Sequence, residues 1–428
     1  MKMNQINNDH SSSSSCNGNH DYTNIIYRVS FTKMHGAGND FVLFKREDIK
    51  RTIVSNKANG HGHTNGNSNG NNNGNGTSNG NGNYSYVPSL DELAYISKSI
   101  ANRKLGVGCD QVIIVSDSPS SKSDYEMLIF NNDGSQAMMC GNGVRCFSKY
   151  ITDNRIPSIY NEDGSINSDR VYHDRPSQRV HTLSGIIITY PQKQQHQHEG
   201  VEEVEENGKD NHNNNHNNNL NNNTQQQQQL NKILSLTKFI KVNMGTPYIL
   251  RTNEERSQLL VVDNRSVMNI NTKSIHFMKT IYVTPTVSLR CVLVSMGNPH
   301  CVIFLKDNQG SIADESQLES MDISYIGRKL ESDGLFIDSC NVEFVSVIAQ
   351  NKLKVRVWER GAGETLACGT GACAVAVASI LTGKSVISES ISVEMPGGEL
   401  IIDWNKEDNK VYKTGPATTV YSSEVNII

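Results

Sequence analysis

The chain has 428 residues, of which 36% are hydrophobic, 20% charged and only 6% aromatic, and its length alone suggests about three domains. Its net charge of −4 and pI near 6.4 disfavour a nucleic-acid-binding surface, which usually carries clustered basic residues. The longest apolar run, around Ala372–Leu381, is far shorter than the roughly 20 residues that span a bilayer. Nine cysteines in a long chain without a secretory signal favour free thiols in the cytoplasm.

Low-complexity stretches account for much of this length. They are rich in Asn, Gly, Ser, Gln and His and lack the apolar residues that offset the entropy of folding. Without them, roughly 300 residues remain, which suffices for two ordinary domains. We therefore expect a disordered tail (1–23), an N-terminal domain (24–250) with insertions at about 56–83 and 192–231, a C-terminal domain (251–411), and a terminal strand (412–428) that returns to the N-terminal domain.

Short β-branched runs alternate with a few helical windows along the rest of the chain. Helices are expected at Ser89–Ala101, Val144–Thr152 and Ala372–Thr382. The Asn/Gln tract separates Gly185–Tyr190 from Phe239–Met244, so we expect it to fill the turn of a β-hairpin. Many strands with few helices predict an α+β fold with mostly antiparallel sheet. The other expected strands are Val29–Met34, Phe41–Phe44, Val112–Val115, Glu126–Phe130, Cys291–Met296, Cys301–Leu305, Asn341–Ile348, Lys352–Trp358, Ser392–Glu394 and Glu399–Trp404.

Two local patterns each occur twice, in the same order. Gly38-Asn39-Asp40-Phe41 precedes Cys140-Gly141-Asn142-Gly143, and Gly297-Asn298-Pro299-His300 precedes Cys368-Gly369-Thr370-Gly371. In the second pair of patterns, Asn298 and Cys368 are 70 positions apart. The first pair is 101 apart and contains an insertion of about 30 residues. The chain therefore reads as two copies of one unit, each with a Cys-Gly-x-Gly turn.

Each of these turns leads into an expected helix. Glycines let backbone N–H groups approach a ligand closely, and a helix N-terminus favours negative charge, so each turn suits a carboxylate. The same field favours a thiolate, so the pKa of Cys140 and Cys368 is expected to fall below the usual value of about 8.5. Two such thiols on opposite faces of one carbon are arranged as in a two-base racemase, in which one removes a proton and the other supplies one.

Several motifs closely resemble those of the diaminopimelate epimerase family. They are Met34-His35-Gly36-Ala37-Gly38-Asn39-Asp40-Phe41, Asn131-Asn132-Asp133-Gly134-Ser135, Cys140–Cys146, Met296–His300 and Glu359–Gly371, and the resemblance runs from about Phe31 to Tyr421. It implies two pseudo-symmetric domains, each a mostly antiparallel sheet wrapped around a central helix, with the active site between them. It also implies an isomerase that interconverts LL- and meso-diaminopimelate for lysine biosynthesis, needs no cofactor or metal, and forms a homodimer.

The resemblance also assigns roles to individual residues. Cys140 and Cys368 match the catalytic acid–base pair, and His300 and Glu359 match polar groups that tune the second thiol. One departure is that Asp333 and Ile337 stand where the family usually has His and Pro. The implied substrate-binding set is Gly141, Asn142, Gly369 and Thr370 for the reacting carboxylate, Asn39 and Gln111 beside the first thiol, Asn131, Asn298, Asn341 and Arg360 for the distal end, and Glu359.

Three alternatives remain open at this stage. A related proline or hydroxyproline racemase would use the same paired thiols, and a thiol redox sensor would oxidise Cys140 and Cys368 to a disulfide. A zinc site that adds Cys146 and Cys373 is disfavoured, because the cysteine spacings are wider than those of typical zinc pairs. Arg145 is expected to pair or pack at the start of its helix.

Overall fold

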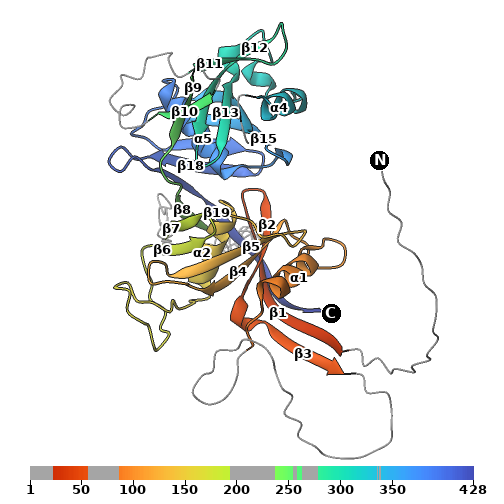
Figure 1. The fold of residues 1–428 in the computed structure, drawn as a ribbon. Coiled ribbons are helices and arrows are strands. Elements are labelled where there is room, and N and C mark those ends of the chain that lie inside the picture. Colours follow the sequence, from red (N-terminus) through yellow and green to blue (C-terminus); the bar gives the residue numbers. More distant parts are fainter. Residues whose placement is uncertain are drawn as a thin grey trace, which may run out of the picture.

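The computed structural model describes residues 23–55, 86–192, 237–253, 258–262, 278–334, 336 and 339–428. Both low-complexity insertions, the N-terminal tail and the His-rich segment after Gln192 lie outside the described residues. The described chain forms two lobes that are joined by the strand β19 (Val411–Ile427) and by the chain that leaves β8 (Thr237–Asn243) (Figure 1). The expected domain boundaries stay a prediction.

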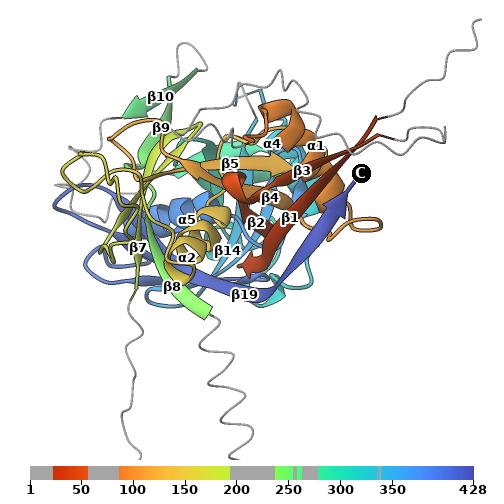
Figure 2. The ribbon, with the colours of Figure 1, turned by 90° about the horizontal axis from the view of Figure 1, so that it is seen from below.

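The first lobe is a ring of eight strands around the helix α2 (Gly143–Asp153). Figure 2 shows α2 inside this ring. Neighbouring strands pair in the order β1, β2, β4, β5, β6, β7, β8 and β19, and β19 then pairs with β1 and closes the ring. Their bounds are β1 Thr23–Gly36, β2 Asn39–Lys45, β4 Gln111–Asp117, β5 Tyr125–Asn131, β6 Gln178–Thr182, β7 Gly185–Pro191, β8 Thr237–Asn243 and β19 Val411–Ile427.

The second lobe surrounds the helix α5 (Gly369–Leu381) in the same manner. Its strands pair in the order β9, β12, β13, β14, β15, β17, β18 and β19. All side chains of α5 from Gly371 onward are buried, which fits a helix that is apolar on every face and enclosed by sheet. The bounds are β9 Tyr248–Asn253, β12 Ser288–Ser295, β13 Pro299–Phe304, β14 Asn341–Ala349, β15 Lys352–Glu359, β17 Ile391–Met395 and β18 Gly398–Trp404.

The two lobes share one topology. In the first lobe, β2 and β4 pair in parallel and so do β5 and β6; in the second, β13 and β14 and then β15 and β17 do the same, with antiparallel pairs between them. A second helix covers the outer face of each sheet: α1 (Leu90–Ala101) in the first lobe and α4 (Ser324–Glu331) in the second. The expected α+β fold of two similar halves, each wrapped around a central helix, is confirmed.

Most elements expected from the sequence are present. Ser89 caps α1 and forms a capping box with Glu92, as the predicted helix start requires. The predicted hairpin is confirmed, since β7 and β8 pair antiparallel between Thr189–Pro191 and Ile240–Val242. Several short elements were missed. These are β3 Lys50–Ser55, β6, β9, β10 Gln258–Val262, β11 Met278–Tyr282, β16 Gly363–Thr365, α4 and the 3₁₀ turns Arg46–Asp48, Leu305–Asn308 and Glu315–Gln317.

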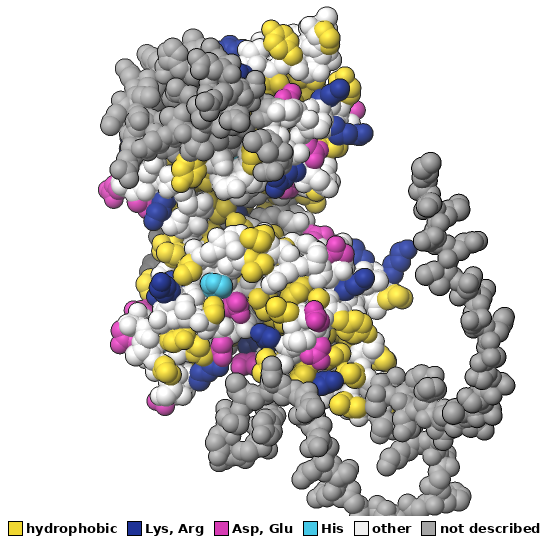
Figure 3. Space-filling model, in the orientation of Figure 1, with side chains coloured by type: hydrophobic (Ala, Val, Ile, Leu, Met, Phe, Trp, Pro, Cys, Tyr) yellow, Lys and Arg dark blue, Asp and Glu magenta, His cyan; other side chains and the backbone are white. Residues whose placement is uncertain are grey.

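On the face shown in Figure 3, basic and acidic side chains of the described residues are interspersed over both lobes, and no single basic patch gathers there. In the described part of the chain, no helix is both long and apolar enough to cross a membrane.

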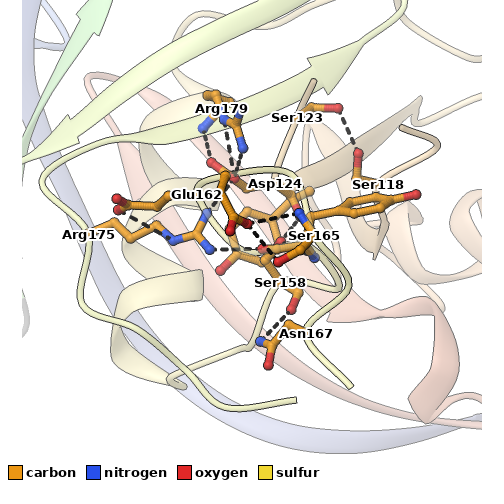
Figure 4. A network of polar contacts seen from close by, with 12 residues as sticks. Ser118, Ser123, Asp124, Ser158, Glu162, Ser165, Asn167, Arg175 and Arg179 are labelled. Carbon is orange, nitrogen blue, oxygen red and sulfur yellow. Dashed lines mark hydrogen bonds and ion pairs between the residues drawn. The ribbon is translucent and has the colours of Figure 1, made fainter. Parts of the chain in front are cut away.

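A buried polar network anchors the segment that connects α2 to β6 (Figure 4). The Asp124 side chain is 2% exposed and accepts hydrogen bonds from Arg175 Nη1 at 2.6 Å and Arg179 Nη2 at 2.8 Å. The backbone N–H of Arg179 also donates to Asp124, at 2.7 Å. This carboxylate therefore ties the connecting segment to the start of β5.

The Asp124→Asn variant should lower the free energy of unfolding by about 3 kcal/mol, because it leaves the mostly buried Arg175 guanidinium with only its longer, 3.8 Å ion pair to the exposed Glu162. Chemical denaturation of the full chain measures this loss. Asp117→Asn is the matched control, since Asp117 pairs with Arg170 at an exposed position, where an ion pair contributes about 0–1 kcal/mol. Equal losses in the two variants would contradict the assignment.

Candidate active site

Cys140 lies at the N-terminus of the central helix of the first lobe. Its Sγ accepts the backbone N–H of Gly143 at 3.4 Å, within the first turn of α2. The Cys140 side chain is half-buried, and Asn142 beside it is almost fully buried. The predicted link between the Cys-Gly-x-Gly turn and a helix N-terminus is confirmed for this half of the chain.

Cys368 holds the equivalent position in the second lobe. It is the N-cap of α5, and its Sγ accepts the backbone N–H of Gly371 at 3.4 Å. Thr370 Oγ1 lies 3.5 Å from this sulfur, and Asn341 Nδ2 lies 4.0 Å from it. Each half of the pseudo-symmetric fold thus presents a thiol with the same first-turn geometry.

The two glycine turns meet at one buried side chain. A Cβ atom placed on Gly141 would lie 2.6 Å from Lys413 Nζ, and one placed on Gly369 would lie closer still. A larger residue at either position would require the end of the Lys413 side chain to move. The turns of the two lobes therefore converge at the strand β19, which carries Lys413.

Predicted amide side chains of the first lobe form two hydrogen-bonded pairs. Asn142 Nδ2 donates to Asn39 Oδ1 at 2.8 Å, so the motif at the β1–β2 turn lies beside the Cys140 turn. Gln111 Nε2 donates to Asn131 Oδ1 at 2.9 Å, across the pair β4–β5. The structure therefore brings Asn39 and Asn142 together, and Gln111 and Asn131 together. Their roles in substrate binding stay predictions.

A second group of predicted residues surrounds Cys368. Besides its contact with the sulfur, Asn341 accepts the backbone N–H of Arg360 through Oδ1 at 2.9 Å. His300 Nε2 contacts Asn298 Oδ1 at 3.1 Å. Glu359 accepts a hydrogen bond from Thr365 Oγ1. The distal-end role of Asn131, Asn298, Asn341 and Arg360 stays a prediction, and Ile337, in the segment before Asn341, lies outside the described residues.

Sequence reasoning missed Glu343, which is fully buried in β14 and lies 2.6 Å from His300 Nδ1 through Oε1. Its Oε1 also lies against the first turn of α5, since a Cβ on Gly371 would be 2.8 Å away. The sequence offered one hint of this site, a single acidic residue within the apolar run Asn341–Ile348. In the structure this position of β14 is buried. Sequence reasoning also missed Lys413, a charged residue at a buried position of β19, where buried and half-exposed residues alternate.

Burial raises the pKa of both candidate thiols, opposite to the direction expected from the sequence. For Cys140, desolvation outweighs the N–H bonds of Gly143 and Asn142 and the positive charges of Lys413 and Arg145. For Cys368, desolvation is reinforced by the Glu359 and Glu343 carboxylates and opposed by Thr370 and the Gly371 N–H. The sequence identifies the helix N-termini but does not reveal how deeply each sulfur is enclosed.

No group of three or more His, Cys, Asp or Glu side chains in the described ranges is arranged to hold a metal ion. Cys146 and Cys373, which a four-cysteine zinc site would need, are fully buried within α2 and α5. They lie among the apolar side chains that pack around each helix, as small hydrophobic residues do.

Two similar halves, each with a thiol at the N-terminus of a central helix, are the arrangement expected of a two-thiol racemase or epimerase. A sequence model of the diaminopimelate epimerase family matches residues 76–203 and 292–420. A diaminopimelate epimerase of Acetivibrio thermocellus is 34% identical over 93% of this chain and 99% of its own length. One of Methanococcus maripaludis is 30% identical over 93% of this chain and 100% of its own. The chain belongs to the diaminopimelate epimerase family.

Solved structures show a more distant likeness. A probable proline racemase from Agrobacterium radiobacter K84 has a TM-score of 0.47 and 10% identity, over 93% of this chain and 92% of its own. That likeness is too low to bear on activity.

Alkylation by iodoacetamide should report the raised pKa of both thiols. Because only the thiolate reacts, the rate at Cys140 and Cys368 should rise with pH to a midpoint above the usual value of about 8.5. Peptide mass spectrometry of the labelled chain measures the rate at each site. The same chain unfolded in urea is the control, and a native midpoint at or below the unfolded one would contradict the prediction.

Proposed function

We propose that this chain is a diaminopimelate epimerase, which interconverts LL- and meso-2,6-diaminopimelate on the route to lysine by a two-base thiol/thiolate mechanism. The single observation that carries the proposal is the convergence of two equivalent thiol turns, one from each lobe, at the strand β19. The names of the curated relatives favour this function over proline racemisation and over a purely redox role.

In the proposed reaction, one cysteine thiolate takes the proton from the α-carbon of the substrate and becomes a thiol. The thiol of the other cysteine then gives its proton to the opposite face of the same carbon and becomes a thiolate. The number of protons is unchanged and the configuration is inverted. A second turnover starts from the reversed protonation state or after proton exchange with solvent.

The α-carboxylate of the substrate would accept hydrogen bonds from backbone N–H groups of the two turns. These are the N–H groups of Gly141 and Asn142 at the start of α2 and of Gly369 and Thr370 at the start of α5. As the α-proton leaves, negative charge develops on this carboxylate, and the fixed N–H donors and helix N-termini stabilise it. No cofactor or metal enters these steps.

The distal amino-acid end of the substrate would be bound by amide side chains and Arg360. A guanidinium forms two parallel hydrogen bonds with a carboxylate, and amide oxygens accept hydrogen bonds from an ammonium group. Proline lacks a second amino-acid end, so this set has no function for it. We further propose that the enzyme acts in the cytoplasm as a homodimer, as the family resemblance implies.

Turnover of LL-diaminopimelate in heavy water tests the proposed function. Early in the reaction, the meso product should carry deuterium at the inverted carbon, while recovered substrate should not, because the donating thiol has exchanged with solvent and the accepting thiolate is a different group. Mass spectrometry of both isomers measures this. A product that keeps its protium, or activity that requires added pyridoxal phosphate, would refute the mechanism.

Cysteine variants provide the control for that experiment. Cys140→Ala and Cys368→Ala should each lower kcat by about 10²–10⁴-fold, since each removes one of two obligatory proton-transfer groups. Cys146→Ala is the matched control, because Cys146 lies in α2 close to Cys140 but is fully enclosed in the core of the first lobe. Its kcat should stay near that of the unmodified chain.

The Arg360→Met variant should raise KM for diaminopimelate by roughly 10- to 100-fold, because it removes a charged hydrogen-bond donor to the distal carboxylate. The effect on kcat should be smaller, since the distal end does not react. Arg356→Met is the matched control: Arg356 lies four positions earlier and binds Glu364 instead. If the two variants had the same KM, Arg360 would not read the distal end.

A further inference from the structure

Lys413 is fully buried, yet its Nζ has no hydrogen-bond partner in the described part of the chain. It lies on the inward side of β19, between Val411 and Gly415, in a strand whose buried and half-exposed positions alternate. A buried ammonium without a partner is costly, because it loses its hydration without compensation. This cost suggests that an anion formed during the function of the protein offsets it.

The location of Lys413 identifies this anion. Its Nζ lies under both thiol turns, at the positions where Gly141 and Gly369 lack a Cβ atom. A second buried cation, Arg145, lies beside it: Nη1 donates to the Gly141 carbonyl at 3.3 Å and Nε to the Pro416 carbonyl at 3.2 Å, while Nη2 has no partner. Among the described residues, no carboxylate forms an ion pair within 4.0 Å of either cation. Negative charge must therefore come from the thiols or the substrate.

The charges around the two thiols differ. Cys140 faces the cations Lys413 and Arg145, which both lower its pKa against the effect of burial. Cys368 also faces Lys413, but its strongest charged neighbours are Glu359 and Glu343, which both raise its pKa. The pseudo-symmetry of the fold thus places the two sulfurs in equivalent backbone positions but in opposite electrostatic surroundings.

We propose that Lys413 is a positioning residue that, together with Arg145, makes Cys140 the thiol that ionises first and leaves Cys368 protonated. Cys140 is then the base that meets the first substrate, and Cys368 is the acid. The inference rests on the proposed two-thiol function, because it assigns the starting roles of the same pair.

The protonation of Lys413 itself fits this role. Burial and the neighbouring Arg145 lower its pKa to about 8, while the thiols raise it. Lys413 is therefore charged at neutral pH, and a thiolate on Cys140 strengthens that charge. The titratable groups that face Lys413 are Arg145, Cys140, Cys368 and Cys373, and those that face Cys368 from other strands are Glu343, with its partner His300, and Glu359.

The test is the pH dependence of iodoacetamide labelling at each cysteine in the full chain. Labelling rates alone are not sufficient, because Cys140 is more exposed than Cys368. The midpoint of each pH profile is independent of access. In the unmodified chain, Cys140 should have the lower midpoint. In Lys413→Met, which keeps side-chain length without charge, the Cys140 midpoint should rise by about one unit, a roughly tenfold loss of labelling at pH 7. The acid limb of kcat/KM should move with it.

Two further variants separate charge from packing. Lys413→Gln keeps hydrogen-bond donors but not the charge, and should behave as Lys413→Met does. Lys149→Met is the matched control, because Lys149 is equally buried but is paired with Asp153 and Thr419; this variant should lose stability without moving either midpoint. Lys413→Met should instead melt at a higher temperature than the unmodified chain, since it removes an unpartnered buried charge.

Each other outcome overturns the proposal. A lower midpoint at Cys368, an unchanged Cys140 midpoint in Lys413→Met, or a wild-type midpoint in Lys413→Gln would show that the Lys413 charge does not hold the thiolate. Failure of Lys413→Met to fold would show that Lys413 is a structural residue. Labelling does not depend on turnover. Absence of epimerase activity would therefore refute the proposed function, whereas the labelling midpoints test the role of Lys413 independently.

Discussion

The structure depends on the path of one strand. β19 pairs through Val411–Thr414 with β18 in the second lobe. It then pairs with β8 at the junction and with β1 in the first lobe as far as Ile427. Because it belongs to the sheets of both lobes, it brings the N-terminal turns of the two central helices against the same inward side chain, Lys413. A site built from two halves of a chain needs this kind of shared element, since neither lobe contains both thiols.

The same enclosure works against the chemistry that it positions. Wrapping a sheet around each helix excludes water from the sulfurs, and burial raises the pKa of both thiols. Backbone N–H groups, helix N-termini and the buried cations act in the opposite direction. A dry site strengthens these interactions too, and it favours the charge that develops on the substrate during proton removal. The arrangement therefore lowers the fraction of thiolate in the empty site but stabilises the transition state.

The sequence predicts the parts of this site that depend on local pattern. The repeated Cys-Gly-x-Gly turns locate both thiols and both central helices, and the hairpin of β7 and β8 is recognisable although a long insertion separates its strands. Glu343 and Lys413 are not predictable in this way, because a charged residue within a strand is usually assigned to the solvent face. Their burial depends on strands that lie far apart in the sequence, and so does the direction in which the thiol pKa is shifted.

Pseudo-symmetry and catalysis make different demands on this fold. A two-base inversion starts from one thiolate and one thiol, so two identical half-sites would share a single charge equally and place half of the molecules in the wrong state for a given isomer. Backbone geometry is the same around Cys140 and Cys368, because the duplicated unit requires it. The side chains supply the difference: β19 and α2 place cations near the first thiol, and β14 and β15 place carboxylates near the second. Residues outside the duplicated turns thus distinguish the two halves.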